Sequence, residues 1–419
     1  MPASPWEARL SRPSAGALYL HVPFCARKCA YCDFASWATR TGDPLMADYA
    51  RALESQVDEV ASLGLLEGCE TAYVGGGTPS LLGPVALGSL VEKVVRVVAP
   101  SELTCEANPD SLSDDVLSAL VESGATRLSV GVQSLCDEEL AILGRLHDAE
   151  LACDRVRAAV ASGFDVSVDL MCATPGQTDK SWTETLAGVG SLGVSHVSVY
   201  PLMIEEGTPF DARYAAQDCP WNAEEVQASR MTQAQLKLES LGFSRYEVAS
   251  YAWPEKACRH NIAYWTGVPY LGLGTGASGM LTLEGYLRLA TRCPRLPSAP
   301  VGTRRVRLTV ETPRAQLAAD PNLAALSFSL EFLDESQAAA EDLMLGARLV
   351  AGLGSDLVEH ARDALGPSLD ETLEGLLKDG LLAERGGRLA PTEWGWLLGN
   401  ELYGRLWELA PGEVAAASC

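Results

Sequence analysis

Long hydrophobic runs are missing from this chain of 419 residues. No apolar stretch reaches the roughly 18 residues that indicate a membrane span. The first thirty residues also lack the basic segment followed by an apolar one that marks a secretory signal peptide. We therefore expect a cytoplasmic protein.

Positive charge is scarce as well. The chain has 32 Lys and Arg against 55 Asp and Glu, a formal net charge of −23. A phosphate polyanion would meet mainly repulsion, because nucleic-acid binding draws on contacts from Lys and Arg. We expect no general nucleic-acid binding. Hydrophobic residues make up 47% of the chain, enough for one large core and a smaller one.

A disulfide framework is not expected, although the chain has 12 cysteines. A reducing cytosol keeps thiols free, and the spacings are irregular. Nine cysteines are scattered and are predicted to be bystanders or small buried apolar residues. The other three form the one cluster, at Cys25, Cys29 and Cys32.

Short apolar runs alternate with helical periodicity over the first two-thirds of the chain. Strands are predicted at residues 18–24, 70–76, 101–108, 127–134, 164–172 and 196–203. Helices are predicted between them, at residues 45–64, 112–124, 148–163 and 179–193. Alternating strands and helices imply parallel pairing with right-handed crossovers, so we predict an α/β sheet or an incomplete barrel. Polar and Gly-rich residues follow the strand ends, where parallel α/β folds bind ligands.

The rest of the chain changes character. A helix near 222–241 and a strand at 243–251 lead into an aromatic segment at 258–278, and a Pro- and Arg-rich stretch follows it. Helices at 339–353 and 369–382, then a hairpin and a last helix at 382–402, suggest a small winged-helix-like α+β domain. The predicted organisation is a tail at 1–16, a barrel at 17–288, a connector at 289–330, the small domain at 331–410 and a tail at 411–419.

The cysteine cluster has the spacing C-x3-C-x2-C on one short segment, CARKCAYC at 25–32. Three soft ligands on a loop suit an iron–sulfur cluster or zinc. Structural zinc sites close with four ligands, and no fourth Cys or His lies at the usual zinc spacing. A cubane held by three thiolates leaves one iron open to a substrate. We therefore expect a [4Fe–4S] cluster on Cys25, Cys29 and Cys32.

This spacing after a first strand resembles that of the radical-SAM superfamily, whose fold is a partial (β/α)6 barrel. The segments YLHVPFCARKCAYCDF (19–34), GGGTPSLL (75–82), GVQS (131–134), GRLH (144–147), PGQT (175–178) and HNIAYW (260–265) are similar to the family of oxygen-independent coproporphyrinogen III dehydrogenase and its heme-chaperone relatives. The similarity runs from about residue 17 to about residue 405. It implies that the open iron binds S-adenosylmethionine (SAM), and the cofactor then carries the chemistry.

The resemblance also implies roles for individual residues. Gly75, Gly76 and Gly77 would let the backbone approach the methionyl ammonium group, with Thr78 offering a hydroxyl. The polar contacts with SAM would come from Glu106, Gln133, Arg145 and Asp169, and the aromatic positions beside the cluster are Tyr19 and Tyr31. Taken singly, GGGTP is more often a turn, and Glu106, Gln133, Arg145 and Asp169 are more often surface or capping residues. Together, at or just after the ends of the strands, they indicate function.

Two features separate the family members. The dehydrogenases carry a fourth cysteine two residues after the third, where this chain has Phe34, and their N-terminal extension is longer. The segment HNIAYW matches the chaperones' HNxxYW motif, in which His260 would bind heme iron while Tyr264 and Trp265 offer flat faces to the macrocycle. His260 could instead be a hydrogen-bonded core histidine.

The resemblance therefore implies a heme chaperone with a [4Fe–4S] cluster, SAM and heme, delivering heme to apo-hemoproteins such as respiratory cytochromes. Because such acceptors are membrane-bound, peripheral membrane contact is conceivable. One alternative is a radical-SAM enzyme of tetrapyrrole metabolism. Another is a protein-docking module with a structural cluster.

Overall fold

The computed structural model describes residues 14–410, 412 and 415–419. Its central feature is a set of six parallel strands whose order in space follows their order in the chain. They are β1 (Ala17–Val22), β4 (Thr71–Gly76), β5 (Glu102–Ala107), β6 (Arg127–Gln133), β7 (Asp165–Cys172) and β8 (His196–Pro201). All six predicted strands are confirmed, and so is the α/β fold.

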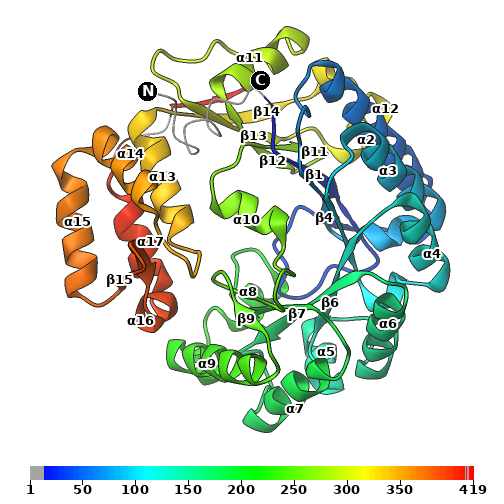
Figure 1. The fold of residues 1–419 in the computed structure, drawn as a ribbon. Helices are drawn as coiled ribbons and strands as arrows, with labels where there is room; N and C mark the ends of the chain where they lie inside the picture. The colour runs from blue at the N-terminus through cyan, green and yellow to red at the C-terminus, as the bar shows by residue number, and fades with distance from the viewer. Residues whose placement is uncertain (1–13, 411, 413–414) are drawn as a thin grey trace.

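Helices cover the outer face of these strands, on the right and lower sides of Figure 1. They are α2 (Pro44–Ser62), α3 (Gly83–Val98), α4 (Asp114–Ser123), α6 (Ala149–Ala161), α7 (Asp179–Gly190) and α9 (Glu224–Ser240). Local sequence sets their ends. The side chain of Ser113 accepts a hydrogen bond from the backbone of Val116 at the start of α4, and Gly124 ends that helix at φ 92°.

The barrel does not close on itself. On one side, β8 pairs antiparallel with β10 (Ser250–Ala252), which pairs with β9 (Ser244–Arg245). The single strand predicted at 243–251 is therefore broken into two short strands, with a turn in which the backbone N–H of Tyr246 donates to the carbonyl of Ser250. On the other side, β1 pairs in parallel with β11 (Tyr270–Leu273).

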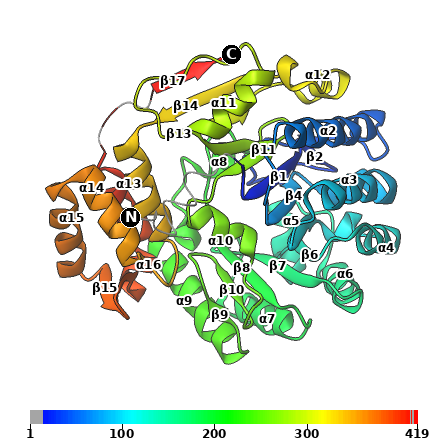
Figure 2. The same cartoon turned by 45° about the horizontal axis from the view of Figure 1, so that its top comes forward.

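The sheet continues beyond β11 into the stretch predicted as a connector. The strands β12 (Ser278–Thr282), β13 (Arg305–Val310), β14 (Phe328–Leu333) and β17 (Ala415–Ser418) add antiparallel pairs and bring the sheet to 13 strands. Figure 2 shows β13, β14 and β17 along this edge, beside α11 (Leu283–Arg292). Residues 289–330 therefore contribute to the large sheet, and so do residues 415–418 of the predicted tail.

Between β14 and β17 the chain forms a helical region, at the left of Figure 1. It contains α13 (Glu335–Gly346), α14 (Ser355–Leu365), α15 (Pro367–Lys378), the hairpin of β15 (Leu382–Arg385) and β16 (Arg388–Pro391), α16 (Glu393–Leu397) and α17 (Gly399–Trp407). Its buried leucines form a hydrophobic cluster of their own. Helices with a small hairpin were predicted for this region as a winged-helix-like domain at 331–410, but residues 331–333 belong to β14 of the large sheet, and α14 was not predicted.

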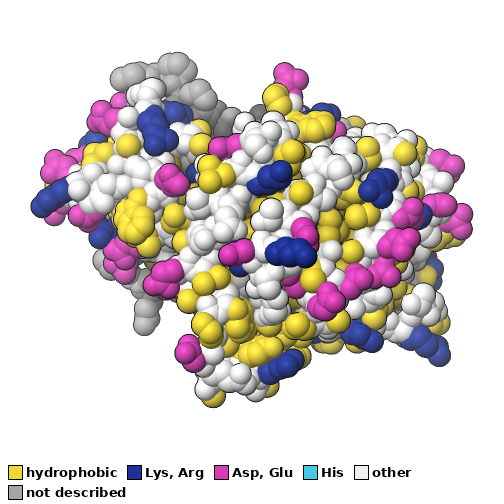
Figure 3. All heavy atoms as spheres, turned by 90° about the horizontal axis from the view of Figure 1, so that it is seen from below, with side chains coloured by type: hydrophobic (Ala, Val, Ile, Leu, Met, Phe, Trp, Pro, Cys, Tyr) yellow, Lys and Arg dark blue, Asp and Glu magenta, His cyan; other side chains and the backbone are white. Residues whose placement is uncertain are grey.

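The helix α10 (Arg259–Trp265), which carries the HNIAYW motif, lies near the centre of Figure 1. It contacts β4 and α13, so it joins the barrel to the helical region. Among the described residues, none of the helices combines the length and apolar character needed to cross a bilayer. On the face drawn in Figure 3, basic side chains stand apart from one another among acidic ones.

Candidate functional site

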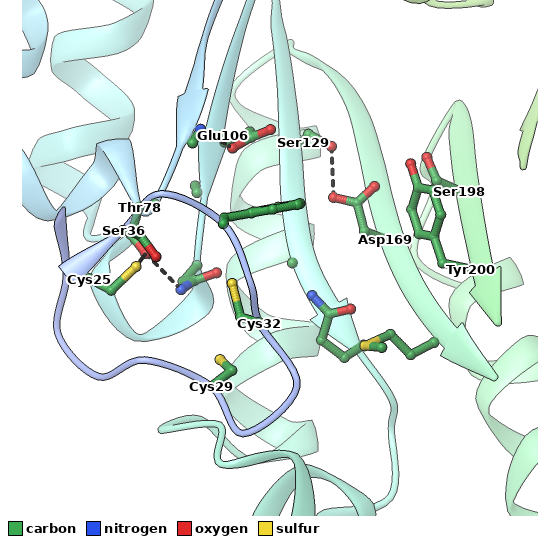
Figure 4. Close-up of a pocket in the computed structure, with 18 of the residues that line it drawn as sticks. Cys25, Cys29, Cys32, Ser36, Thr78, Glu106, Ser129, Asp169, Ser198 and Tyr200 are labelled. Carbon is green, nitrogen blue, oxygen red and sulfur yellow. Dashed lines mark hydrogen bonds between the residues drawn. The ribbon is translucent and has the colours of Figure 1, made fainter. Parts of the chain in front are cut away.

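The loop after β1 carries the three clustered cysteines to the rim of a cavity inside the barrel. Cys25, Cys29 and Cys32 all line this cavity, which has a volume of about 400 Å³. Figure 4 shows the three side chains on one loop, with Asp169, Ser198 and Tyr200 on neighbouring strands across the cavity. The carboxyl ends of the strands thus meet the cysteine loop, as the sequence predicted.

The surroundings of the thiols fit a cluster. Burial raises the pKa of the Cys25 and Cys32 thiols, and binding to a metal centre would favour their thiolate forms. In the part of the chain that the structure describes, no three His, Cys, Asp or Glu side chains converge on a single metal ion. A cubane takes each thiolate on a different iron, so three thiols spread around one cavity suit a cluster of this kind.

Thr78 and Arg145 contact the sulfur atoms directly. The hydroxyl of Thr78 donates to Cys25 Sγ at 3.6 Å, and the guanidinium group of Arg145 donates to Cys29 Sγ at 3.4 Å. Asn108 connects the two, because its amide donates to Thr78 at 3.1 Å and accepts from Arg145 at 2.7 Å. Arg145 also donates to the carbonyl of Gly131 at 2.7 Å, and its buried Nε has no partner among the described residues. These bonds place Arg145 beside the cysteine loop.

Close packing gives the three glycines a structural reason besides their predicted role toward SAM. A Cβ on Gly77 would lie 2.7 Å from the carbonyl oxygen of Phe24, and one on Gly76 would lie 2.5 Å from the ring of His21. Gly75 would meet Tyr73 at 2.7 Å. The space that side chains would need is thus occupied by β1, the cysteine loop and Tyr73, while Gly76 and Gly77 also line the cavity. These contacts hold the loop against the end of β4.

Glu106 and Asp169 are buried carboxyl groups on the cavity wall. Burial raises the pKa of Glu106 to about 7, although Tyr73 donates to it at 2.8 Å and the backbone of Gly76 donates at 2.9 Å. Burial also raises the pKa of Asp169, which accepts from Ser129 at 2.9 Å. Burial thus disfavours the ionised form of each carboxyl group, and a cationic ligand would favour that form.

Gln133 lines the same cavity at the end of β6. Its φ is 68°, the pairing of β6 with β7 is irregular here, and the backbone N–H of Ser134 donates to the carbonyl of Val132 across it. A residue other than glycine in this tight turn is strained.

Tyr31 lines the cysteine cavity and packs against Phe210, with ring centroids 6.5 Å apart. Tyr19 lies elsewhere. Its hydroxyl is 2.9 Å from Nδ1 of His21, and it lines a second cavity of about 510 Å³. Tyr19 thus lines the second cavity, near β11, rather than the cysteine cavity, and its place beside the cluster stays a prediction.

The second cavity lies between α10, the strands β11 and β12, and α13 of the helical region. Tyr264 and Trp265 of the HNIAYW motif form part of its wall, and Phe34 lies at the border of both cavities with 62% of its side chain exposed. The indole Nε1 of Trp265 and Oε2 of Glu341 are buried there without a hydrogen-bond partner among the described residues. This cavity has free polar groups as well as aromatic faces.

His260 lines neither cavity. Its ring is buried, with Nδ1 at 2.9 Å from the Thr71 hydroxyl and Nε2 at 2.9 Å from the Tyr264 hydroxyl. Burial lowers its pKa to about 3, so the imidazole is neutral. Thr71 begins β4, so His260 lies at the end of the barrel opposite the cysteine loop.

Several residues of the site were not singled out from the sequence. They are Ser36, Asn108, Ser129, Ser198 and Tyr200. One signal could have found the strand residues, because polar side chains recur at every second position in strands that are otherwise apolar.

An open six-stranded parallel barrel with three thiols on the loop after its first strand defines a radical-SAM protein. The profile described as Radical SAM superfamily matches residues 19–187. Over 388 residues, 91% of this chain and 92% of the relative, the sequence is 34% identical to the heme chaperone HemW of Mycobacterium tuberculosis (strain ATCC 25618 / H37Rv). It is 32% identical to the heme chaperone HemW of Bacillus subtilis (strain 168), over 92% of this chain and 97% of the relative. The chain belongs to the HemW family.

The structure of coproporphyrinogen III oxidase (HemN) from Escherichia coli, a radical-SAM enzyme, is similar in fold. Its TM-score is 0.73 at 22% identity, and the match covers 96% of this chain and 92% of that one. The likeness extends over the helical region as well as the barrel.

Proposed function

We propose that this protein is a heme chaperone that binds a [4Fe–4S] cluster, SAM and heme and passes heme to apo-hemoproteins such as respiratory cytochromes. Similarity to HemW proteins over nine-tenths of the chain supports the proposal. The observation that carries it is the pair of adjoining cavities, one ringed by three thiols and one walled by aromatic residues of the HNIAYW motif.

Cys25, Cys29 and Cys32 would hold the cluster, and the cluster with its bound SAM would supply one-electron chemistry. Glu106 and Asp169, as carboxylates, would face the positive groups of SAM, and Gln133 would add an amide contact. Arg145 and Thr78 would donate to the thiolate sulfurs and stabilise their negative charge.

A matched pair of cysteine variants tests this cluster. After anaerobic reconstitution, Cys29→Ala should lose most of its iron and its SAM-sensitive EPR signal. Cys136→Ala, which removes a thiol outside the loop, should keep both. A Cys29→Ala protein that still holds four irons would contradict the assignment.

Heme is proposed to occupy the second cavity, against Tyr264 and Trp265. His260 is proposed as the axial ligand, since a neutral imidazole is a good donor to iron. To reach the iron, Nε2 must give up its hydrogen bond with Tyr264. Tyr264→Phe removes that competing bond and should tighten heme binding about fivefold, the equivalent of one hydrogen bond.

A heme titration followed by absorbance checks this expectation. His260→Ala should change the Soret band as well as the affinity, because the ligand on iron changes. If Tyr264→Phe leaves the affinity unaltered and His260→Ala leaves the Soret band unaltered, His260 is not the ligand.

Delivery needs its own measurement. The heme-loaded protein should convert an apo-cytochrome to its holo form faster than free heme does. The transfer is measured on protein with the cluster and on protein without it. The acceptor can be offered in detergent and in membrane vesicles, which also tests peripheral membrane contact. Appearance of protoporphyrinogen IX from coproporphyrinogen III, in step with 5′-deoxyadenosine, would favour the enzyme alternative instead.

A further inference from the structure

The interior of the barrel is polar, which is unusual for this architecture. Closed parallel barrels fill their interior with layers of branched apolar side chains. Here the side chains that line the cavity from β5 to β8 alternate along each strand and are mostly polar, namely Thr104, Glu106, Arg127, Ser129, Ser167, Asp169, His196 and Ser198. An interior of this kind suits a polar ligand better than it suits packing.

Two groups at the floor of the cavity lack hydrogen-bond partners. Thr104 and Arg127 are neighbours in the register of β5 and β6, and they are 1% and 3% exposed. One terminal nitrogen of Arg127 donates to the carbonyl of Lys256 at 3.0 Å. Its other terminal nitrogen and the hydroxyl of Thr104 are buried with no partner among the residues that the structure describes. Leaving buried donors unpaired costs free energy, so a ligand that accepts from both would be stabilised.

The carboxyl groups around the floor are engaged elsewhere. Glu102 accepts from the backbone N–H groups of Arg259 and His260, at 3.1 and 2.9 Å. Asp169 accepts from Ser129. No ion pair joins Arg127 to a carboxylate in the described part of the chain, and although its charge acts on Asp169 across the cavity, its unpaired nitrogen is left for a ligand.

His196 does not compete for the same ligand. Its two ring nitrogens lie 2.7 Å from the hydroxyl of Ser167 and 2.9 Å from that of Tyr246, and burial lowers its pKa well below the usual value. The ring is therefore neutral and already bonded. The guanidinium group of Arg127 is what would attract an anion.

The floor is separate from the cysteine end. Arg127 begins β6 and Gln133 ends it, so their Cα atoms are about 20 Å apart along the strand. A molecule whose charged end lies at the cysteine loop cannot satisfy Arg127 with that same end. Asn261 of the HNIAYW motif also lines the cavity, so α10 closes the floor with an amide side chain.

A carboxylate fits this floor better than a phosphate. A carboxylate is planar and forms charge-assisted hydrogen bonds with a guanidinium edge. A dianionic phosphate would suffer more repulsion from Glu106 and Asp169, which share the cavity. We infer that the barrel floor is a subsite for the carboxylate group of a small molecule, held by Arg127 and Thr104 beneath the SAM end of the cavity. SAM is proposed to place its charged end at the cysteine loop and heme to occupy the second cavity, so a carboxylate at the floor would come from a further molecule, and the inference goes beyond the proposed function.

Titration calorimetry on the anaerobically reconstituted full-length protein tests the subsite. The probes are acetate, its neutral isostere acetamide, and inorganic phosphate. Acetate should bind saturably, and acetamide and phosphate should bind at least tenfold more weakly. Arg127→Gln should weaken acetate binding about tenfold or more, because a charge-assisted bond is lost. Thr104→Val keeps the side-chain shape and should weaken acetate binding about fivefold, because one hydrogen bond is lost.

Arg155→Gln is the matched control, since Arg155 lies on the outer helix α6 and pairs there with Asp114 and Asp154. It should bind acetate as the wild type does. No acetate binding to the wild type, tighter binding of phosphate, or equal acetate affinity in Thr104→Val would each overturn the inference. Thr104→Val decides the matter even if Arg127→Gln does not fold. The titration uses neither heme nor an acceptor protein, so its failure leaves the proposed function standing.

Discussion

At the scale of single residues, Glu106 links the site to pH. Its folded pKa of about 7 lies above the ordinary 4.5, so the stability it contributes is fully present below 4.5 and is lost as pH rises through 7. The free energy of unfolding of the wild type relative to Glu106→Gln should therefore fall by up to a few kcal/mol over that interval. Denaturant titrations at several pH values measure this difference. Glu106→Gln also loses the hydrogen bond from Gly76, but this loss shifts the difference in free energy of unfolding equally at every pH. A difference that does not vary with pH would therefore contradict the raised pKa.

SAM should reverse part of this trend. A cation near Glu106 favours the carboxylate, so wild-type SAM affinity should rise as pH increases through about 7. Glu106→Gln should bind SAM more weakly, with an affinity that varies less over this interval. Calorimetric titrations of the reconstituted proteins with SAM test both statements. Identical pH profiles for the two proteins would show that Glu106 does not contact SAM's charge.

Gln133 combines a strained backbone conformation, which lowers stability, with a side chain that lines the cavity. Its φ of 68° suits glycine, so Gln133→Gly should raise the free energy of unfolding by about 1 kcal/mol while weakening SAM binding. Ala99, at φ 49° after α3, is the matched control. Ala99→Gly should also stabilise the protein but leave SAM affinity unchanged. Equal SAM affinity in both variants would mean that the strain at Gln133 has no binding role.

At the scale of elements, the end of β4 holds the cysteine loop through backbone hydrogen bonds. The N–H of Gly77 donates to Val22 at 2.8 Å and that of Thr78 donates to Phe24 at 2.7 Å. In Gly77→Ala the new Cβ would meet the backbone of Phe24, so the loop must shift and iron content should drop severalfold. Gly375→Ala, inside α15 with open space around it, should retain its iron and gain about 1 kcal/mol of stability. Iron and sulfide assays with thermal melts separate the two outcomes.

Helices and strands with clear hydrophobic periodicity were predictable from the sequence. Strands that form by pairing with segments far away in the sequence were not. The six barrel strands were predicted because each is a short apolar run bounded by turn residues. The strands β11 and β12 were missed because each is short and interrupted by a glycine, and they lie within or directly after the aromatic segment at 258–278. Their pairing with β1 and β13 joins segments far apart in the chain, and propensity carries no information about such pairing. Nothing in HNIAYW alone shows that α10 lies at the end of the barrel opposite the cysteines.

The same limit applies to the candidate site. Cys25, Cys29 and Cys32 could be predicted because spacing alone brings them together. Arg145 was identified, but its bond to Cys29 depends on how the loop after α5 (Asp137–Leu143) folds back across the barrel. Tyr19 and His21 are alternate residues of β1, and only the sheet's environment reveals that Tyr19 faces the second cavity.

At the scale of the whole molecule, one tryptophan ties the helical region to the barrel side. The indole of Trp396 donates to the carbonyl of Val248 at 2.8 Å, and the guanidinium group of Arg245 lies 4.0 Å from its ring centroid. Trp396→Phe removes the hydrogen bond and part of the cation–π contact, so stability should fall by about 1–2 kcal/mol. Trp394 on the same helix is 57% exposed, and Trp394→Phe should have little effect. Chemical denaturation of both variants measures the difference. Equal losses of stability in the two variants would show that the contacts of Trp396 do not stabilise the packing of the helical region on the barrel.

The order of the strands has a consequence for synthesis on the ribosome. From β1 to β8 each new strand joins its immediate predecessor, so this half of the sheet can grow as the nascent chain emerges. The opposite half is assembled outward from β1 by segments translated much later, and β17 joins β14 only after the helical region has been made. Until β11 has been made, β1 keeps an unpaired flank, and the loop that bears the thiols directly follows that strand. A cluster inserted during translation would thus bind to a loop whose supporting sheet is still incomplete.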